Sequence, residues 1–152
     1  MNARSIAAWR ATARLRADWL AHAEPISIPQ AGIPAYRIEH QFPVIAIVGV
    51  WRPGLFVGGK IFDSLTAPEI AAAVAHETGH LAARDNLKRA LLRACRDLML
   101  IVPGGRALDN AWTESSESAA DEYAARQGRT VALDLAAALV KISRLIPLGS
   151  RP

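Results

Sequence analysis

The stretch SLTAPEIAAAVAHETGHLAARD, residues 64–85, predicts the helix around which the rest of the chain is organised. Thr66 is a favourable N-cap, and Glu69 three residues later completes a capping box. Pro68 is tolerated in the first turn of a helix, where its missing N–H has no partner to lose. The Ala-rich run that follows favours a helix that continues to about Arg84.

Two histidines on this helix stand four residues apart and therefore share one face. His76 and His80 can bind one metal ion together, and Glu77 lies close enough to act as a general base on water at the metal. The alternative is a core helix whose histidines are satisfied by hydrogen bonds, but burying such polar groups is costly unless each is paired. A glycine inside a helix costs about 1 kcal/mol relative to alanine, so Gly79 predicts close approach by another backbone. We therefore expect a Zn²⁺ site.

A catalytic zinc needs a third protein ligand and one open position. The segment HETGHLAARDN lacks a further histidine at the usual place, since Ala83 and Asn86 stand there. The acidic stretch WTESSESAADEYAAR, residues 112–126, is the predicted source of the ligand. Within it, Glu117 and Asp121 are four residues apart, which suits one carboxylate on the metal and a second that orients a ligand histidine.

More than one residue of this acidic stretch could be the third metal ligand. Glu114 lies on the same predicted helix, but one turn after it stands a neutral serine, whereas Asp121 stands one turn after Glu117. The small residues at 119–120 would also let this helix pack closely on the Ala-rich helix. In the other interpretation the acidic residues form a solvated face: Glu114, Glu117, Asp121 and Glu122.

The remaining chain reads as one α+β domain over residues 1–152. Three short apolar runs between Pro and Gly breaks predict strands of a small sheet: YRIEH, PVIAIVGV and GLFVGG. "EPISIPQAGIP" reads as a connector. Further helices are predicted over four ranges: 5–22, 86–100, 109–127 and 131–146.

Composition narrows the classes of protein. The chain has 152 residues, 51% of them hydrophobic, and a net charge of +4. We find no nucleic-acid motif beside this charge and expect no nucleic-acid partner. There is neither a secretion signal nor an apolar stretch long enough for a bilayer. The single cysteine, Cys95, excludes an internal disulfide and fits a reducing compartment, so we expect the cytoplasm or the cytoplasmic face of a membrane.

HETGH followed by ESAAD resembles the gluzincin peptidases. More narrowly, residues 52–91 resemble two related bacterial families, the HtpX and CAAX prenyl endopeptidase family and the BlaR/MecR antirepressor family, and the similarity covers roughly residues 35–127. The resemblance therefore implies the bacterial cytoplasm or the cytoplasmic face of a bacterial membrane. The resemblance implies a zincin-like fold, in which a small antiparallel sheet packs on the active-site helix. It also implies Zn²⁺ ligands and supporting residues at these positions: His76, His80 and Glu117 as ligands, Glu77 as base, and Asp121 as hydrogen-bond partner of a zinc histidine, His76.

The expected activity is that of an endopeptidase acting on peptide or protein substrates. The alternative is a proteolytically silent, zinc-stabilised sensor or interaction domain of a larger membrane protein. Members of both families carry transmembrane helices, so we expect either a catalytic domain with membrane-spanning segments outside this chain or a compact relative. The oligomeric state stays open.

Two further features have competing interpretations. GLFVGG, residues 54–59, is the candidate edge strand for binding an extended peptide, or an ordinary core strand. The basic helix over 84–96 either rests on a membrane surface or presents a solvated face with its leucines in the core. For stabilising the oxyanion four side chains are available: His22, His40, Tyr123 and Arg126.

Overall fold

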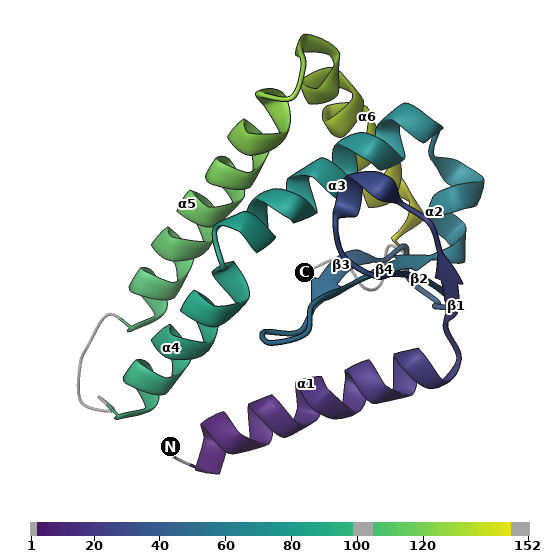
Figure 1. Cartoon of the computed structure of the whole chain (residues 1–152). Coiled ribbons are helices and arrows are strands. Elements are labelled where there is room, and N and C mark those ends of the chain that lie inside the picture. Colours follow the sequence, from purple (N-terminus) through teal and green to yellow (C-terminus); the bar gives the residue numbers. More distant parts are fainter. Residues whose placement is uncertain (1–2, 99–104, 147–152) are drawn as a thin grey trace.

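The computed structural model describes residues 3–98 and 105–146. Its elements form one α+β arrangement, as predicted (Figure 1). The helices are α1 (Ala3–Ala21), α2 (Gly59–Ser64), α3 (Ala67–Ala82), α4 (Asp85–Leu98), α5 (Gly105–Ala125) and α6 (Arg129–Leu145). The strands are β1 (Glu24–Ile26), β2 (Ala35–Ile38), β3 (Ile45–Val48) and β4 (Gly54–Gly58), with a 3-10 turn, η1 (Pro29–Ala31), between β1 and β2.

The four strands form one mixed sheet in the order β1-β2-β4-β3. β1 pairs antiparallel with β2, and β3 pairs antiparallel with β4, but β2 and β4 run parallel. The sheet is therefore mixed where the resemblance implied an antiparallel one. The chain changes direction between β2 and β3 and again between β3 and β4, so β4 runs the same way as β2, beside which it lies. Gly49 at this turn has φ 117°, and a Cβ there would lie 2.7 Å from the Arg52 carbonyl oxygen, so the turn requires glycine.

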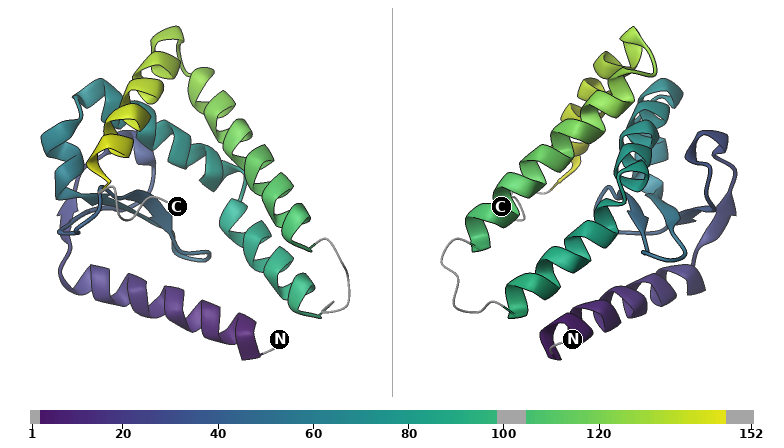
Figure 2. Two further views of the ribbon diagram at one scale, coloured as in Figure 1. Left: turned by 180° about the vertical axis from the view of Figure 1, so that it is seen from behind. Right: turned by 60° about the vertical axis from the view of Figure 1, so that its left-hand side comes forward.

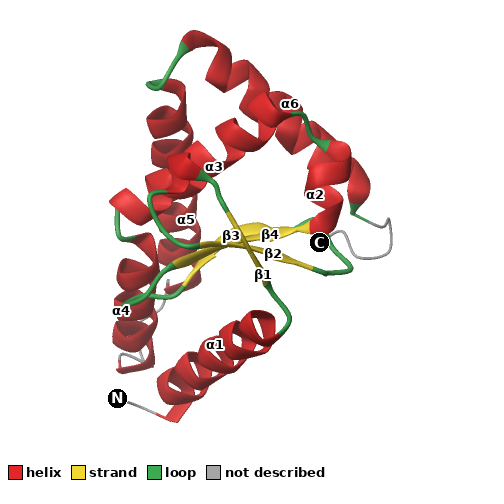
Figure 3. Ribbon diagram, turned by 45° about the vertical axis from the view of Figure 1, so that its right-hand side comes forward, coloured by secondary structure: helices red, strands yellow, loops and turns green. Residues whose placement is uncertain are grey.

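The strand GLFVG occupies the centre of the sheet, which corrects the prediction that it is an exposed edge. Leu55, Phe56 and Val57 of β4 are fully buried. Leu55 and Val57 pack in the core cluster with Val74 of α3, while Phe56 contacts Trp19 of α1 on the other face. Figures 2 and 3 show the resulting layers, with α3 and α6 on one side of the sheet and α1 on the other. The edge strands are β1 and β3, and β3 is the one next to β4.

Helix α3 begins as its sequence predicts. The backbone N–H of Thr66 donates to a Glu69 carboxylate oxygen at 2.8 Å, and both halves of the capping box are present. Glu69 also pairs with Lys141 of α6 at 2.8 Å, and this lysine is the main reason that the pKa of Glu69 lies below its ordinary value. The start of the helix and its packing on α6 thus depend on the same carboxylate.

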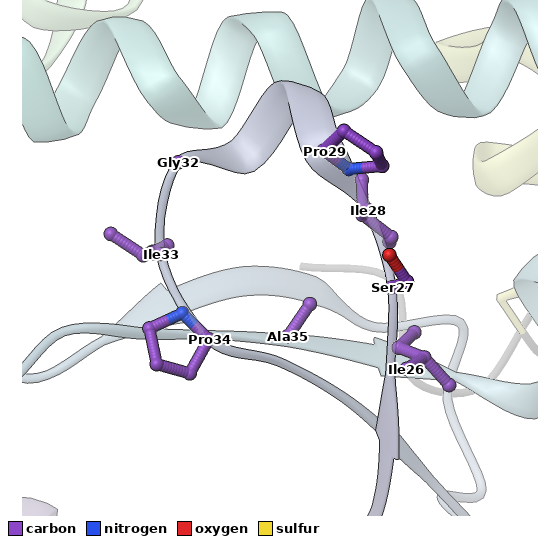
Figure 4. A pocket seen from close by; sticks show the side chains of 8 residues that line it. All are labelled: Ile26, Ser27, Ile28, Pro29, Gly32, Ile33, Pro34 and Ala35. Atoms are coloured by element: carbon purple, nitrogen blue, oxygen red, sulfur yellow. The ribbon is translucent and has the colours of Figure 1, made fainter.

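The segment expected to be a plain connector contains β1 and η1. Together with the start of β2 it forms an open pocket (Figure 4). Eight residues line this pocket: Ile26, Ser27, Ile28, Pro29, Gly32, Ile33, Pro34 and Ala35. None of these eight has a titratable side chain, so the pocket holds no general base and no metal ligand.

The basic helix predicted over 84–96 corresponds to α4. The side chain of Leu91 on this helix is exposed. The Arg89 guanidinium lies over the Trp112 ring, 5.1 Å from the ring centre. The side chains of Arg93, Cys95 and Arg96 lie outside the described part of the structure. Within residues 3–98 and 105–146, no helix combines the length and the apolar content that crossing a lipid bilayer requires. Contact of α4 with a membrane surface stays a prediction.

Candidate metal centre

Helices α3 and α5 lie side by side, and their contact brings the two sequence motifs together (Figure 1). Gly79 is the point of closest approach: a Cβ there would lie 3.1 Å from the Ala120 Cα and 3.2 Å from the Tyr123 Cβ. The close approach predicted from Gly79 is confirmed. Ala120 and Ala124 are buried in this contact, whereas Ala119 is exposed.

Replacing Gly79 by leucine should therefore separate the two helices. We expect Gly79→Leu to lower the free energy of unfolding by about 1–3 kcal/mol, the usual cost of overpacking. The matched control is Ala82→Leu on the exposed side of the same helix, where we expect a change within about 0.5 kcal/mol. Urea unfolding of both variants measures the difference. Equal stabilities would show that the helices tolerate a wider spacing.

The three predicted ligand side chains converge at one point. The Nε2 atoms of His76 and His80 are 3.1 Å apart. The Glu117 carboxylate lies 3.5 Å from the His76 Nε2 through one oxygen and 3.7 Å from the His80 Nε2 through the other. In the described part of the chain, His76, His80 and Glu117 form a group whose ligand atoms lie close enough together to hold a metal ion.

These separations fit one tetrahedral ion. Donors at about 2.0–2.2 Å from a tetrahedral centre lie about 3.3–3.6 Å from one another. The two Nε2 atoms are 3.1 Å apart, and each lies 3.5 or 3.7 Å from a different Glu117 oxygen, so the three side chains are close to that spacing. A set of two imidazoles and one carboxylate suits a divalent transition metal and leaves a fourth position open.

A carboxylate faces the far nitrogen of each histidine. The Nδ1 atom of His76 lies 2.8 Å from an Asp121 oxygen, and the Nδ1 atom of His80 lies 2.8 Å from an Asp85 oxygen. Because a carboxylate only accepts, each Nδ1 carries the hydrogen, and in the neutral rings both Nε2 lone pairs point into the shared space. Two lone pairs 3.1 Å apart repel each other unless a proton or a metal cation lies between them. The arrangement therefore suits a bound cation.

Glu77 is positioned beside this centre by the edge strand. One of its carboxylate oxygens accepts a hydrogen bond from the Ile47 backbone N–H of β3 at 3.1 Å. Partial burial raises the pKa of Glu77, and the hydrogen bond from Ile47 and the two nearby histidines offset only part of that rise. A carboxylate with a raised pKa takes up a proton more readily, which is what a general base requires.

Three residues near the centre were not predicted as part of it. Ser116 donates to the same Asp85 oxygen at 2.7 Å that accepts from His80. Burial alone would raise the pKa of Asp85, but the hydrogen bonds from His80 and Ser116 outweigh it, so this pKa lies below its usual range. Asn86 donates to the carbonyls of Ile47 and Gly49 and so attaches the start of α4 to β3. The sequence signal for Asp85 was its place at a helix start, five residues after His80.

The other acidic and polar candidates lie elsewhere. Glu114 is exposed and does not belong to the converging group of ligand atoms. Glu122 pairs with Arg126 at 2.7 Å, and the ring of His40 packs against Trp19. Among the oxyanion candidates, Tyr123 lies against α3, next to Gly79.

The α+β fold and this group of possible metal ligands are consistent with a zincin-like metallopeptidase. The sequence pattern of peptidase family M48 matches residues 10–145, and the chain belongs to peptidase family M48. The expected resemblance to a metallopeptidase family is thereby confirmed. No curated protein matches the chain.

Proposed function

We propose that this protein is a zinc-dependent endopeptidase in which His76, His80 and Glu117 hold the metal, Asp121 orients His76, and Glu77 is the general base. The observation that carries the proposal is the convergence of three ligand atoms within 4.8 Å of one another beside a half-buried glutamate. Two histidines and one glutamate are a ligand set used by catalytic zinc.

Glu77 performs the proton transfers in this proposal. Zinc, when bound, supplies Lewis acidity, which polarises the peptide carbonyl and lowers the pKa of water. The Glu77 oxygen that is not bonded to Ile47 takes a proton from water as the water oxygen bonds to the peptide carbon. The same oxygen then delivers that proton to the amide nitrogen as the C–N bond breaks. The hydrogen bond from Ile47 keeps the carboxylate in place throughout.

The edge strand β3 replaces residues 54–59 as the proposed substrate strand. Gly58 donates its N–H to the Val44 carbonyl, so by antiparallel alternation the backbone groups of Ile45 and Ile47 face away from β4. The Ile47 N–H already donates to Glu77, and the Ile47 carbonyl accepts from Asn86. We propose that an extended peptide pairs with the backbone of Ile45, which lies beside the anchored base.

An internally quenched peptide library, incubated with the zinc-loaded protein, tests the activity directly. We expect hydrolysis that stops on addition of a chelator and returns with zinc. Mass spectrometry of the products gives the cleaved bond. A protein that binds zinc and cleaves no peptide would instead fit the silent sensor or interaction domain.

Removal of the metal should also destabilise the fold, because it leaves two opposed lone pairs and a carboxylate together. At a free metal concentration about 100 times the Kd, binding stabilises the folded state by about 2.7 kcal/mol. For a chain of this size that corresponds to a fall in Tm on the order of 5–10 °C on chelation. Calorimetry with excess chelator, then with zinc restored, measures it. An unchanged Tm in protein shown to be free of zinc contradicts this expectation.

A further inference from the structure

Asp85 is the first residue of α4 and is almost completely buried beside the metal centre. One of its oxygens accepts from two donors, the His80 Nδ1 at 2.8 Å and the Ser116 Oγ at 2.7 Å. Its other oxygen lies 3.8 Å from the Lys88 Nζ. The carboxylate thus connects three helices: α3 through His80, α4 through its own backbone, and α5 through Ser116.

This contact depends on the break between α3 and α4. In an unbroken helix the residue five positions on lies about 140° round the axis and about 7.5 Å along it, so the two side chains point apart. Arg84, which separates the helices, has φ 55°, in the left-handed region that non-glycine residues seldom occupy. The chain therefore bends at Arg84, and the bend brings Asp85 to His80. A strained residue at this position indicates that the surrounding structure fixes the turn.

We propose that Asp85 is the positioning residue of His80 and that it holds its ligand more firmly than Asp121 holds His76. This inference rests on the proposed zinc site. By accepting the Nδ1 hydrogen, Asp85 directs the Nε2 lone pair of His80 towards the shared space.

Burial distinguishes the two carboxylates. The Asp121 side chain is 54% exposed, whereas that of Asp85 is 9% exposed. When Asp121 is neutralised, water can reach the Nδ1 hydrogen of His76 and accept it in place of the carboxylate. Water has little access to Asp85. The Ser116 Oγ also lies 3.3 Å from the His80 Nδ1, but this hydroxyl is neutral and donates to Asp85, so it is a weaker acceptor than the carboxylate. Ser116 strengthens the difference, because it donates to Asp85 and directly precedes Glu117 in the chain.

The test measures zinc affinity of the metal-free full chain by competition with a chelating dye. We expect Asp85→Asn to weaken zinc binding by about 100-fold and Asp121→Asn by about 10-fold, the two ends of the usual range for such partners. The matched control is Lys88→Gln, which removes the exposed ion-pair partner of Asp85 and should change the affinity by less than about twofold. The visible spectrum of the Co²⁺-loaded protein should shift in Asp85→Asn and stay unchanged in Lys88→Gln.

Thermal unfolding of the metal-free variants separates positioning from folding, since a merely structural role would lower their Tm without changing the Co²⁺ spectrum. If Asp85→Asn fails to fold, Ser116→Ala decides: it keeps the carboxylate but removes its second donor. We expect Ser116→Ala to bind zinc more weakly than the parent protein and to shift the Co²⁺ spectrum. An affinity and a spectrum equal to those of the parent protein would overturn the inference. Parental affinity in Asp85→Asn, or a larger loss in Asp121→Asn, would overturn it as well while zinc binding by the parent protein stands. A parent protein that binds no zinc overturns the proposed site and this inference together.

Discussion

Glu77→Gln is expected to lower the rate of peptide hydrolysis by about 10²–10⁴-fold, the contribution of general base catalysis. The amide oxygen of glutamine can still accept the hydrogen bond from the Ile47 N–H that holds Glu77 in place. The side chain keeps its size, but it can no longer take a proton from water. Zinc content should remain near one ion per chain, because Glu77 is not among the converging ligand atoms.

The measurement is kcat/KM on the best peptide from the library, together with the zinc content of each preparation. Glu39→Gln is the matched control, because it makes the same chemical change on a side chain that is exposed and paired with Arg37. It should cleave as the parent protein does. A parental rate in Glu77→Gln would rule out Glu77 as the base.

Glu117→Ala is expected to lose the metal and the activity together. Its carboxylate lies 3.5 and 3.7 Å from the two histidine nitrogens, and its removal leaves two protein ligands where catalytic zinc takes three. We therefore expect zinc content to fall close to zero after dialysis. The rate of hydrolysis should fall to the level of the chelated parent protein.

Glu114→Ala is the matched control for this variant. Glu114 lies one turn earlier on α5 and is exposed, so its removal takes away the same chemical group at a position outside the centre. Zinc content and activity should stay close to those of the parent protein. Retention of zinc in Glu117→Ala with its loss in Glu114→Ala would reverse the assignment of the third ligand.

Helix α3, which carries His76, Glu77 and His80, could be predicted almost completely from local sequence. Its start depends on Thr66 and Glu69, which contact each other within one turn. The pairing of His76 with His80 follows from the geometry of a single helix, and both nitrogens do face the same point. Interactions over three or four residues need no knowledge of the rest of the fold.

The contribution of α5 could be predicted only in part. The spacing of Glu117 and Asp121 placed both on one face, and the glycine at 79 indicated that another backbone packs there. Neither feature by itself decides which turn of α5 faces the histidines. That depends on how Ala120 and Ala124 fit against α3, a contact between residues about 40 positions apart in the chain.

By itself, the sequence determined the α+β class, helix α3 with its two histidines and glutamate, and the acidic helix α5 that lies beside it. Only the tertiary structure decided that residues 54–58 form an interior strand, because an apolar run reads the same whether one or two strands flank it. It alone also brought Asp85 to His80, since that contact requires a left-handed residue at Arg84, where the side chain gives no local preference for such a turn. Strand order and the bend between α3 and α4 depend on the packing of distant segments, which no local pattern encodes.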